Sequence, residues 1–583
     1  MLTNSFVFID IKFITLFFIS FIISLSACKS NENTDNIPPL LISSNPVDGA
    51  TAVDQKSTIS FNYNDKIVLS SSSKILLNGV SVSAYVTDKI LTVSATLQPG
   101  TTYTLAIPGN AVSDPSGNYA AATSITFTTS GSTTTAGTYE AEKATLSGDA
   151  AIASTIAGYT GTGYVNTNSG NVSFTIQADQ TGYYDVNLRY YSAASKQNDF
   201  YVDGTKMSTL TFNVATTWTN LNVGKLKLTA GSHTIALVKS WGYIQLDNMT
   251  VSYAGATLGP FNIAATLVTS TPSVQAVNLY NFLKSNFGTN IISGTMAAYS
   301  TNINEATWVY NNTGKWPALT CFDFIDHTNP NQNWVQYSAP FTLGQSWWNN
   351  NGIVGFSWHW RDPLTKSGSF YVPSAATAPD TGTTFDISKV TDTNSAEYKA
   401  IIVDIDVVAG YLQQFKDANI PVVWRPLHEA EGGWFWWGAK GAEPYKVLWK
   451  LLFDRLVNVH RLNNLIWVWT SQADDAATNW YPGDAYVDVI GMDIYPGANQ
   501  HGSQYLSFNK IKTLFEGKKL ITLSECGSVP DPALMKEYGD TWSWFMPWNG
   551  DYTESDSHNG ATWWAKFFNY DYVITRDKMP SLK

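Results

Sequence analysis

Short segments in the N-terminal part of the chain alternate between hydrophobic and polar residues with a period of two. Between residues 38 and 130 these segments include 58–63, 67–69, 102–107 and 125–127, and turn residues such as Asn78-Gly79 and Pro99-Gly100 separate them. Because successive side chains of a strand point to opposite faces of a sheet, such alternation buries one face and exposes the other. The pattern predicts a β-sandwich over residues 38–130.

A second block of short strands follows a linker at residues 131–137, whose Gly, Ser and Thr content is typical of a flexible connection. This block covers residues 138–255 and includes strand-like segments at 182–186 and 230–235. Its strand spacing predicts another all-β sandwich. Residues 256–268 are expected to link it to the rest of the chain.

From residue 273 onward, helical segments such as 401–418 and 445–461 alternate with buried apolar runs. This alternation within residues 269–583 predicts either a (β/α)8 TIM barrel or a doubly wound sheet. Eight evenly distributed runs favour the barrel, and they are residues 291–297, 318–325, 352–360, 420–428, 464–471, 487–495, 519–525 and 541–548.

The charge balance excludes two classes of ligand. Asp and Glu number 46 against 35 Lys and Arg, which gives a net charge of −11, whereas nucleic acids and anionic lipid surfaces require a basic face. Aromatic residues make up 14% of the chain, a content that favours a neutral ligand such as a sugar, although a large β-rich protein also places aromatics in its core. The cysteines Cys28, Cys321 and Cys526 are too few for a disulfide framework, and we expect buried thiols at the last two.

The N-terminal sequence is typical of an export signal. Residues 13–27 are almost wholly apolar, follow Lys12, and end in Leu25-Ser26-Ala27-Cys28, which is too short for a membrane span. The ending resembles a bacterial lipobox, which implies cleavage after residue 27, acylation of Cys28 and a tether over residues 28–37. The alternative is an ordinary signal peptide with a chance cysteine. We expect an exported lipoprotein, membrane-anchored on the outer membrane or cell surface of a bacterium.

Polar and aromatic residues gather at the ends of the predicted barrel strands, where such barrels carry their functional groups. Glu429 directly follows the fourth run and Glu525 ends the seventh, so the two face each other across the barrel mouth. Opposed carboxylates are what cleavage of a glycosidic bond requires. A solvated strand-end carboxylate is the alternative for each glutamate alone. The other strand-end residues are His359, Trp360, His428, Asp493, Tyr495 and Trp548.

The sequence motifs around these residues are more specific for one family of enzymes. The segment Trp424-Arg425-Pro426-Leu427-His428-Glu429 with the following Gly432–Gly438, the segment 490–495, and Leu523-Ser524-Glu525-Cys526-Gly527 together resemble glycoside hydrolase family 26. This resemblance implies a retaining endo-hydrolase with Glu429 as the acid/base and Glu525 as the nucleophile. It also implies substrate contacts from His359, His428, Trp434, Asp493, Tyr495 and Trp548. Glu429 would have to stay protonated, and Tyr495 could donate to ionised Glu525.

Members of that family are chiefly β-1,4-mannanases, so the implied substrate is mannan, galactomannan or glucomannan, as polysaccharide or oligosaccharide. Three alternatives stay open, namely a β-glucanase, a β-xylanase, or a catalytically inactive surface glycan-binding protein. The resemblance implies no cofactor for catalysis. We expect a monomer that contacts a membrane only through its lipid anchor and does not bind nucleic acid.

The two N-terminal blocks carry resemblances of their own. Residues 44–49, Ser-Asn-Pro-Val-Asp-Gly, resemble the opening of bacterial immunoglobulin-like spacer domains. Residues 139–142, Tyr-Glu-Ala-Glu, and residues 244–248, Ile-Gln-Leu-Asp-Asn, resemble carbohydrate-binding module family 35, a jelly-roll sandwich. This second resemblance implies a structural Ca²⁺ held by Glu140, Glu142 and Asp247, and a sugar-stacking position at Trp241. Ca²⁺ prefers several hard oxygen ligands, which agrees with these carboxylates.

Overall fold

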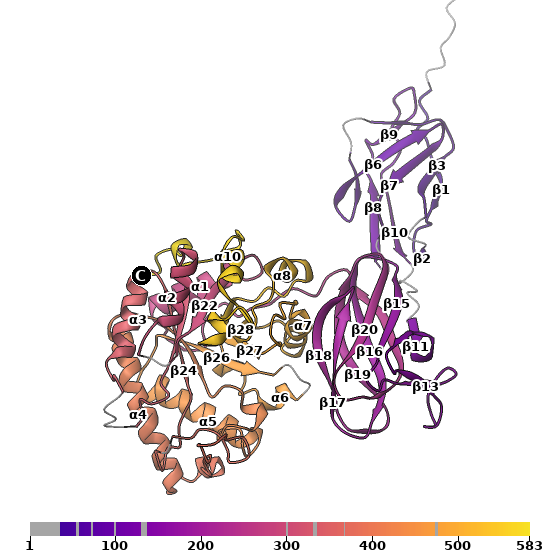
Figure 1. Ribbon diagram of the computed structural model, residues 1–583. Helices are drawn as coiled ribbons and strands as arrows, with labels where there is room; N and C mark the ends of the chain where they lie inside the picture. The colour runs from indigo at the N-terminus through magenta and orange to yellow at the C-terminus, as the bar shows by residue number, and fades with distance from the viewer. Residues whose placement is uncertain are drawn as a thin grey trace, which may run out of the picture. The chain divides into compact units, whose positions relative to one another are not determined.

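The structure is a computed structural model that describes residues 35–53, 57–70, 74–97, 101–129, 137–298, 301–329, 335–366, 368–472 and 476–583. The chain divides into two compact units, Met1–Thr133 and Thr134–Lys583. The second unit holds both the second β-sandwich and the barrel (Figure 1). The lipobox and the turn Pro99-Gly100 lie outside the described residues.

The first unit is the predicted immunoglobulin-like sandwich. Asn78 and Gly79 both have positive φ and form the tight turn of one hairpin, which is the geometry that an Asn-Gly pair favours. The main strand order is β1-β3-β7-β6-β5-β8-β10-β2, and β4 pairs with β9. The strands are β1 Leu41–Asn45, β2 Ala50–Val53, β3 Ile59–Tyr63, β4 Val68–Leu69, β5 Ile75–Leu77, β6 Val80–Thr87, β7 Ile90–Ser94, β8 Thr102–Ile107, β9 Val112–Ser113 and β10 Thr123–Thr129.

The second sandwich consists of two antiparallel sheets that enclose an apolar core. One sheet has the order β13-β14-β21-β16-β19 with β11 beside β21, and the other has the order β12-β15-β20-β17-β18. Strand β16 alternates strictly between buried and half-buried side chains, as a strand between core and surface must. The elements are β11 Gly137–Glu140, η1 Ala141–Lys143, β12 Thr145–Ser147, β13 Ala151–Ala153, β14 Tyr164–Asn166, β15 Asn171–Ala178, β16 Gly182–Ser192, β17 Lys196–Val202, β18 Thr205–Phe212, β19 Ala215–Leu228, β20 Gly231–Trp241 and β21 Gln245–Gly255.

The remaining strands form a closed parallel barrel, not an open doubly wound sheet. Each strand pairs with the next one along the chain, and β22 closes the ring by pairing with both β23 and β29. All eight predicted runs contain one strand each, and the short β30 adds to β22 outside the ring. The strands are β22 Ile291–Met296, β23 Leu319–Asp323, β24 Ile353–Trp358, β25 Val422–Pro426, β26 Leu465–Ser471, β27 Val489–Ile494, β28 Leu520–Cys526, β29 Trp544–Pro547 and β30 Val573–Ile574.

Helices surround the barrel (Figure 1). Helix α4 begins before its predicted start because Ser395 caps it, accepting a hydrogen bond from the Tyr398 amide. The helix predicted over 445–461 starts at Ala442 and ends in a π-helical turn. The helices are α1 Val274–Asn286, α2 Asn304–Thr313, α3 Ala339–Asn349, α4 Ala396–Asp417, α5 Ala442–Asp454, α6 Ala477–Trp480, α7 Tyr505–Leu514, α8 Pro532–Tyr538, α9 Asp551–Glu554 and α10 Ala561–Phe568, with shorter turns η2 Ile387–Thr391, η3 Ala430–Gly432, η4 Arg455–Val459, η5 Asp484–Tyr486 and η6 Arg576–Lys578.

Helix α7 joins the second sandwich to the barrel. Its residues Tyr505 and Leu506 are buried in the apolar core of the sandwich, and the Tyr505 hydroxyl donates to the Lys225 carbonyl. A Cβ on Gly502 would lie 2.2 Å from the Lys206 carbonyl oxygen, so the two backbones approach as closely as only glycine allows. None of the helices in the described part of the chain is long and apolar enough to cross a membrane.

Candidate active site

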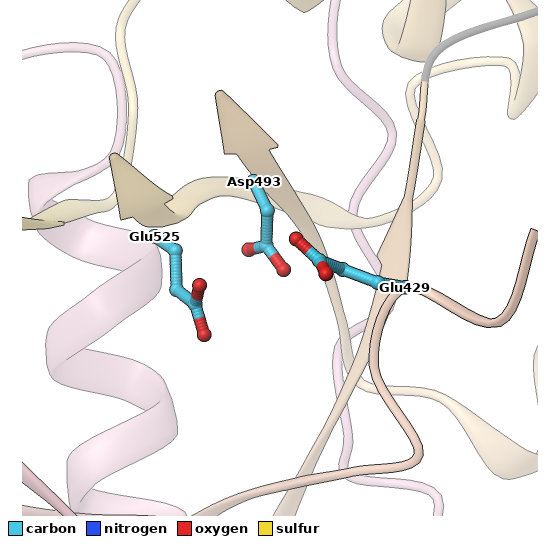
Figure 2. A group of neighbouring side chains, drawn as sticks. All are labelled: Glu429, Asp493 and Glu525. Atoms are coloured by element: carbon cyan, nitrogen blue, oxygen red, sulfur yellow. The ribbon is translucent and has the colours of Figure 1, made fainter. Parts of the chain in front are cut away.

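Three carboxylates meet at the carboxyl ends of the barrel strands. Glu429 follows β25, Asp493 lies near the end of β27, and Glu525 lies near the end of β28. One oxygen of each lies within 4.8 Å of an oxygen of the other two. Figure 2 shows the three side chains pointing toward one another from separate strands. Three acids so close cannot all carry an uncompensated negative charge, so their protonation must differ.

The backbone that presents Glu429 is strained. Leu427 and Glu429 have φ values of 51° and 53°, in the left-handed region that non-glycine residues rarely adopt. Each such residue costs about 1–3 kcal/mol and persists where the surrounding structure imposes it. The strained turn directly follows Pro426, which ends β25, and it directs the Glu429 carboxylate toward the other two acids.

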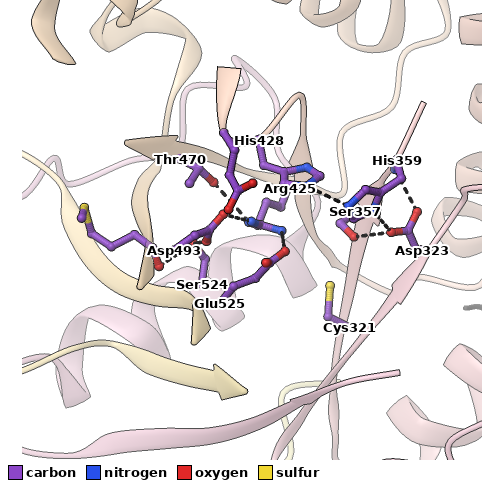
Figure 3. A network of polar contacts seen from close by, with 12 residues as sticks. Cys321, Asp323, Ser357, His359, Arg425, His428, Thr470, Asp493, Ser524 and Glu525 are labelled. Atoms are coloured by element: carbon purple, nitrogen blue, oxygen red, sulfur yellow. Dashed lines mark hydrogen bonds and ion pairs between the residues drawn. The ribbon is translucent and has the colours of Figure 1, made fainter. Parts of the chain in front are cut away.

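Arg425 supplies the compensating positive charge. Its Nη1 donates to Glu525 Oε1 at 2.8 Å, its Nη2 forms an ion pair with Asp493, and its Nε donates to Thr470 Oγ1 at 3.1 Å. Ser524 Oγ donates to the other Asp493 oxygen at 2.8 Å. Arg425 is buried, and a buried charge is tolerated only when it is paired and hydrogen-bonded in this way. Figure 3 shows this network.

Glu525 has one hydrogen-bond donor on each oxygen. Besides Arg425, the Tyr495 hydroxyl donates to Glu525 Oε2 at 2.6 Å. Both donors favour the ionised carboxylate. Burial raises the pKa of Asp493 to about 7 against the lowering effect of Arg425. Arg425 and Tyr495 therefore fix the position of both Glu525 oxygens.

Glu429 has the opposite environment. Burial, followed by the charges of Asp493 and Glu525, raises the pKa of Glu429 to about 8. Its hydrogen-bond donor is Trp434, whose Nε1 lies 3.1 Å from Glu429 Oε2. A Cβ on Gly432 would lie 1.9 Å from the Trp434 ring, so the glycine allows that ring to lie flat on the backbone. Glu429 is therefore the acid that stays protonated near neutral pH.

Two histidines lie beside the carboxylates and are linked to Asp323. His359 Nδ1 and its backbone amide both bond to Asp323, and His359 Nε2 lies 3.0 Å from His428 Nε2. Burial lowers the pKa of His428 well below its usual value, so this ring is neutral. Within the described residues His428 Nδ1 has no hydrogen-bond partner. The Asp323 carboxylate fixes the tautomer and the orientation of His359, and through it the position of His428.

The predicted aromatic positions divide between the site and the core. Trp434 is half-buried beside Glu429, whereas Phe435, Trp436 and Trp437 are buried. The Trp548 ring is also half-buried and lies 5.5 Å from the His359 ring. The strand-end Trp360 is a core residue instead, because its Nε1 donates to the buried Asp404.

Two charged members of this network, Arg425 and Asp323, had no role predicted from the sequence. Arg425 lies inside the quoted motif, and Asp323 lies inside the run 318–325. The signal was the position of each charge within an otherwise apolar strand, since a charge there must be paired. Cys321 and Cys526 are the buried free thiols that were predicted.

The predicted sugar-stacking residue of the second sandwich is accessible. The Trp241 side chain is 64% exposed, and Lys196 Nζ lies 5.2 Å from the centre of its ring. The neighbouring Tyr243 is 53% exposed and faces the same ammonium group at 5.5 Å. Exposed aromatic rings such as these offer apolar surface suited to the face of a sugar.

The predicted calcium ligands converge on one loop. Thr160 donates its amide to Asp247 Oδ1 and its hydroxyl to Glu140 Oε2, both at 2.8 Å. Glu142 Oε1 accepts from the Thr162 amide at 2.8 Å, while its Oε2 is buried and, among described residues, has no partner. A buried carboxylate oxygen without a donor and a set of hard oxygens fit a Ca²⁺ ion.

Arg189 competes with such an ion, because it forms an ion pair with Asp247. In the described part of the chain, only one group of three or more Asp, Glu, His or Cys side chains has ligand atoms that all lie within 4.8 Å of one another. That group is Glu429, Asp493 and Glu525. The carboxylate oxygens at the Thr160 loop are therefore of the type that calcium prefers, but they are not gathered as closely as the ligands of a bound ion.

A closed parallel barrel with two opposed glutamates at its mouth is the arrangement of a glycoside hydrolase. Family models match three parts of the chain: glycosyl hydrolase family 26 over residues 268–578, carbohydrate binding module family 35 over 137–254, and a bacterial Ig-like domain over 35–129. The protein belongs to glycosyl hydrolase family 26.

Characterised proteins resemble most of the chain. A mannan endo-1,4-beta-mannosidase of Thermothelomyces thermophilus is 34% identical, over 76% of this chain and 91% of that protein. Mannan endo-1,4-beta-mannosidase B of a Piromyces species is 37% identical, over 76% of this chain and 77% of that protein. The crystal structure of the Podospora anserina GH26-CBM35 β-(1,4)-mannanase, 34% identical, superposes with a TM-score of 0.53 over 76% of this chain and 99% of that one.

Proposed function

We propose that the protein is an endo-acting β-1,4-mannanase that cleaves mannan, galactomannan or glucomannan. The observation that carries the proposal is the pair Glu429 and Glu525, with oxygens within 4.8 Å and opposite environments. The relatives described above, which are mannanases by name, support the choice of polymer. A panel of purified mannans, β-glucan and β-xylan with product analysis tests it. Release of manno-oligosaccharides supports the proposal, hydrolysis of another polymer reassigns the substrate, and binding without hydrolysis leaves a glycan-binding protein.

The mechanism that fits is double displacement with retention. Glu525, positioned by hydrogen bonds from Arg425 and Tyr495, attacks the anomeric carbon while Glu429 protonates the leaving oxygen. A covalent glycosyl-enzyme forms, and Glu429, now ionised, removes a proton from the water that hydrolyses it. Retaining pairs lie about 5–5.5 Å apart and inverting pairs about 6.5–9.5 Å apart. The close approach of the oxygens supports retention.

The residues around the pair serve substrate binding in this proposal. His359, His428, Asp493 and Tyr495 offer polar atoms at the barrel mouth, and Trp434 and Trp548 offer half-buried rings. Trp434 has a second effect, since the hydrogen bond that it donates to Glu429 lowers the pKa of this carboxyl and so partly offsets the larger rise caused by burial.

The second sandwich is proposed to hold sugars through Trp241. Replacing Trp241 with alanine is expected to weaken binding to insoluble mannan about tenfold, because stacking on the ring is lost. Pull-down with the full chain carrying Glu525→Gln measures binding without turnover. Val214→Ala, at another exposed apolar position of the same sandwich, is the control and should bind as before. Equal binding by the Trp241 and Val214 variants would contradict the role of Trp241.

A structural Ca²⁺ at the Thr160 loop is also proposed. Adding calcium is expected to raise the melting temperature of the module transition, because a ligand held only by the folded state adds about 2.7 kcal/mol at one hundred times its Kd. Calorimetry of the full chain with calcium and then with chelator measures the shift. Glu142→Gln should abolish it, whereas Glu516→Gln at an exposed site should not. A shift that survives in Glu142→Gln would place the ion elsewhere.

Membrane anchoring through Cys28 is proposed from the lipobox motif. Cys28→Ser is expected to move most of the protein from the membrane fraction to the soluble fraction, because the residue that carries the acyl chains is gone. Fractionation of expressing bacterial cells checks this. A Cys28→Ser protein as membrane-bound as the original would disprove the anchor.

A further inference from the structure

A cavity of about 300 Å³ lies between the barrel mouth and strand β18 of the second sandwich. The barrel contributes the ends of β26 and β27 and the start of α7, and the sandwich contributes residues of its edge strand. The lining residues that matter here are Ser208, Thr209, Gln472, Tyr495, Gln500 and Ser507.

A second cavity, of about 580 Å³, continues the first one. Both are lined by Ser208, Thr209, Gln472 and Ser507. The second cavity runs on along the sandwich past Thr211, Asn213 and Asn222. Together they form one groove, here called the interdomain groove, whose two walls come from different domains.

The interdomain groove starts at the reacting carboxylates. Its lining includes Asp493 and Tyr495, and Tyr495 donates to Glu525. On the opposite side the backbone amide of Gln472 donates to Glu431 Oε2 at 2.8 Å, and Glu431 lies two residues after Glu429. A polymer that lies across Glu429 and Glu525 can therefore extend directly into this groove.

The sandwich wall is held in place. Tyr505 and Leu506 of α7 are buried in the sandwich core, and the Tyr183 and Tyr505 rings stack at 6.2 Å. Lys227 Nζ donates to the Glu537 carbonyl at 2.6 Å. Since α7 starts beside the groove, the same contacts fix the distance between its two walls.

The lining chemistry suits a neutral, hydroxylated ligand. Apart from Lys206, Lys510 and Asp493, its polar lining consists of hydroxyl and amide side chains, among them Ser208, Thr209, Thr211, Asn213, Asn222 and Gln472. Lys206 is neutralised by Asp199 at 2.9 Å, and Asp493 by Arg425. Such groups exchange hydrogen bonds with sugar hydroxyls without selecting for charge.

We propose that the sandwich is part of the active site: strand β18 forms one wall of distal subsites that bind the sugar residues of the β-linked substrate farthest from the cleaved bond. This deepens the proposed mannanase function and depends on it. The module thus acts in turnover of soluble chains, in addition to any binding through Trp241, which lines neither cavity.

The test compares substrate lengths. Thr209 is exposed in the groove, so the ring introduced by Thr209→Trp should fill the groove. Thr175→Trp is the control, because Thr175 is an exposed threonine of the same sheet that lies outside both cavities. For Thr209→Trp, kcat/KM on a manno-hexaose should fall about tenfold, while kcat/KM on a manno-triose keeps the original value. Gln472→Ala should reproduce the length dependence with a smaller loss.

Turnover of the short substrate proves that the variant is folded and that the mannanase function stands. If Thr209→Trp treats both lengths as the original protein does, the distal subsites do not exist. An equal loss on both lengths would likewise overturn the proposal, because it would place the effect at the reaction centre or in folding. An original protein inactive on every mannan substrate would refute the function itself.

Discussion

Glu525→Ala is expected to lower kcat on every substrate by about 10⁴-fold or more, since at least about 5 kcal/mol of transition-state stabilisation is lost with the nucleophile. No neighbouring group can replace it: Asp493 is tied to Arg425 and Ser524, and Glu429 is protonated. Good leaving groups do not help, because the covalent step itself is lost. Assays on mannan and on an aryl mannoside measure the loss.

Removing Glu525 also affects the fold, because Arg425 Nη1 loses its acceptor in a buried site. Glu525→Gln keeps an amide oxygen there and is equally inactive in the proposed mechanism, so it separates catalysis from stability. Glu516→Ala removes an exposed carboxylate and should leave kcat unchanged. A Glu525→Gln protein that retains a tenth of the original turnover would show that Glu525 is not the nucleophile.

The barrel could be predicted because its strands are buried on both faces. The run 464–471 holds the continuous apolar stretch 465–469, and β26 and β28 are buried at every position. Closure could be inferred only from the count of eight runs. The pairing of β22 with both β23 and β29, which closes the ring, joins residues far apart in the chain and leaves no local pattern.

The site could be predicted only in part for a similar reason. Glu429 and Glu525 follow from strand ends, but the bonds from Arg425 to Asp493 and Glu525 span 68 and 100 residues. The left-handed backbone at Leu427 and Glu429 is likewise imposed by packing and has no sequence signal such as glycine. The wall that β18 contributes beside Tyr495 depends on how two domains pack, which neither domain's own pattern contains.

Glu429→Ala is expected to behave differently from Glu525→Ala. On mannan kcat should fall about 10²–10⁴-fold, the usual contribution of a general acid and base. In the original protein activity should fall as the pH rises through about 8, because the raised pKa keeps Glu429 protonated below that pH and the acid is lost above it. This alkaline limb of kcat/KM should be absent from the residual activity of Glu429→Ala.

An aryl mannoside with a good leaving group needs little protonation, so Glu429→Ala should still form the glycosyl-enzyme. Water then attacks without a base, and the intermediate accumulates as a burst of released phenol. Azide needs no base, so adding it should restore turnover and yield a β-mannosyl azide, while the original protein first releases the β-anomer of its products. NMR gives the anomeric configuration of the azide product and of the first hydrolysis product. An α-configured azide, or a burst-free variant that azide cannot rescue, would mean that Glu429 is not the acid/base of a retaining pair.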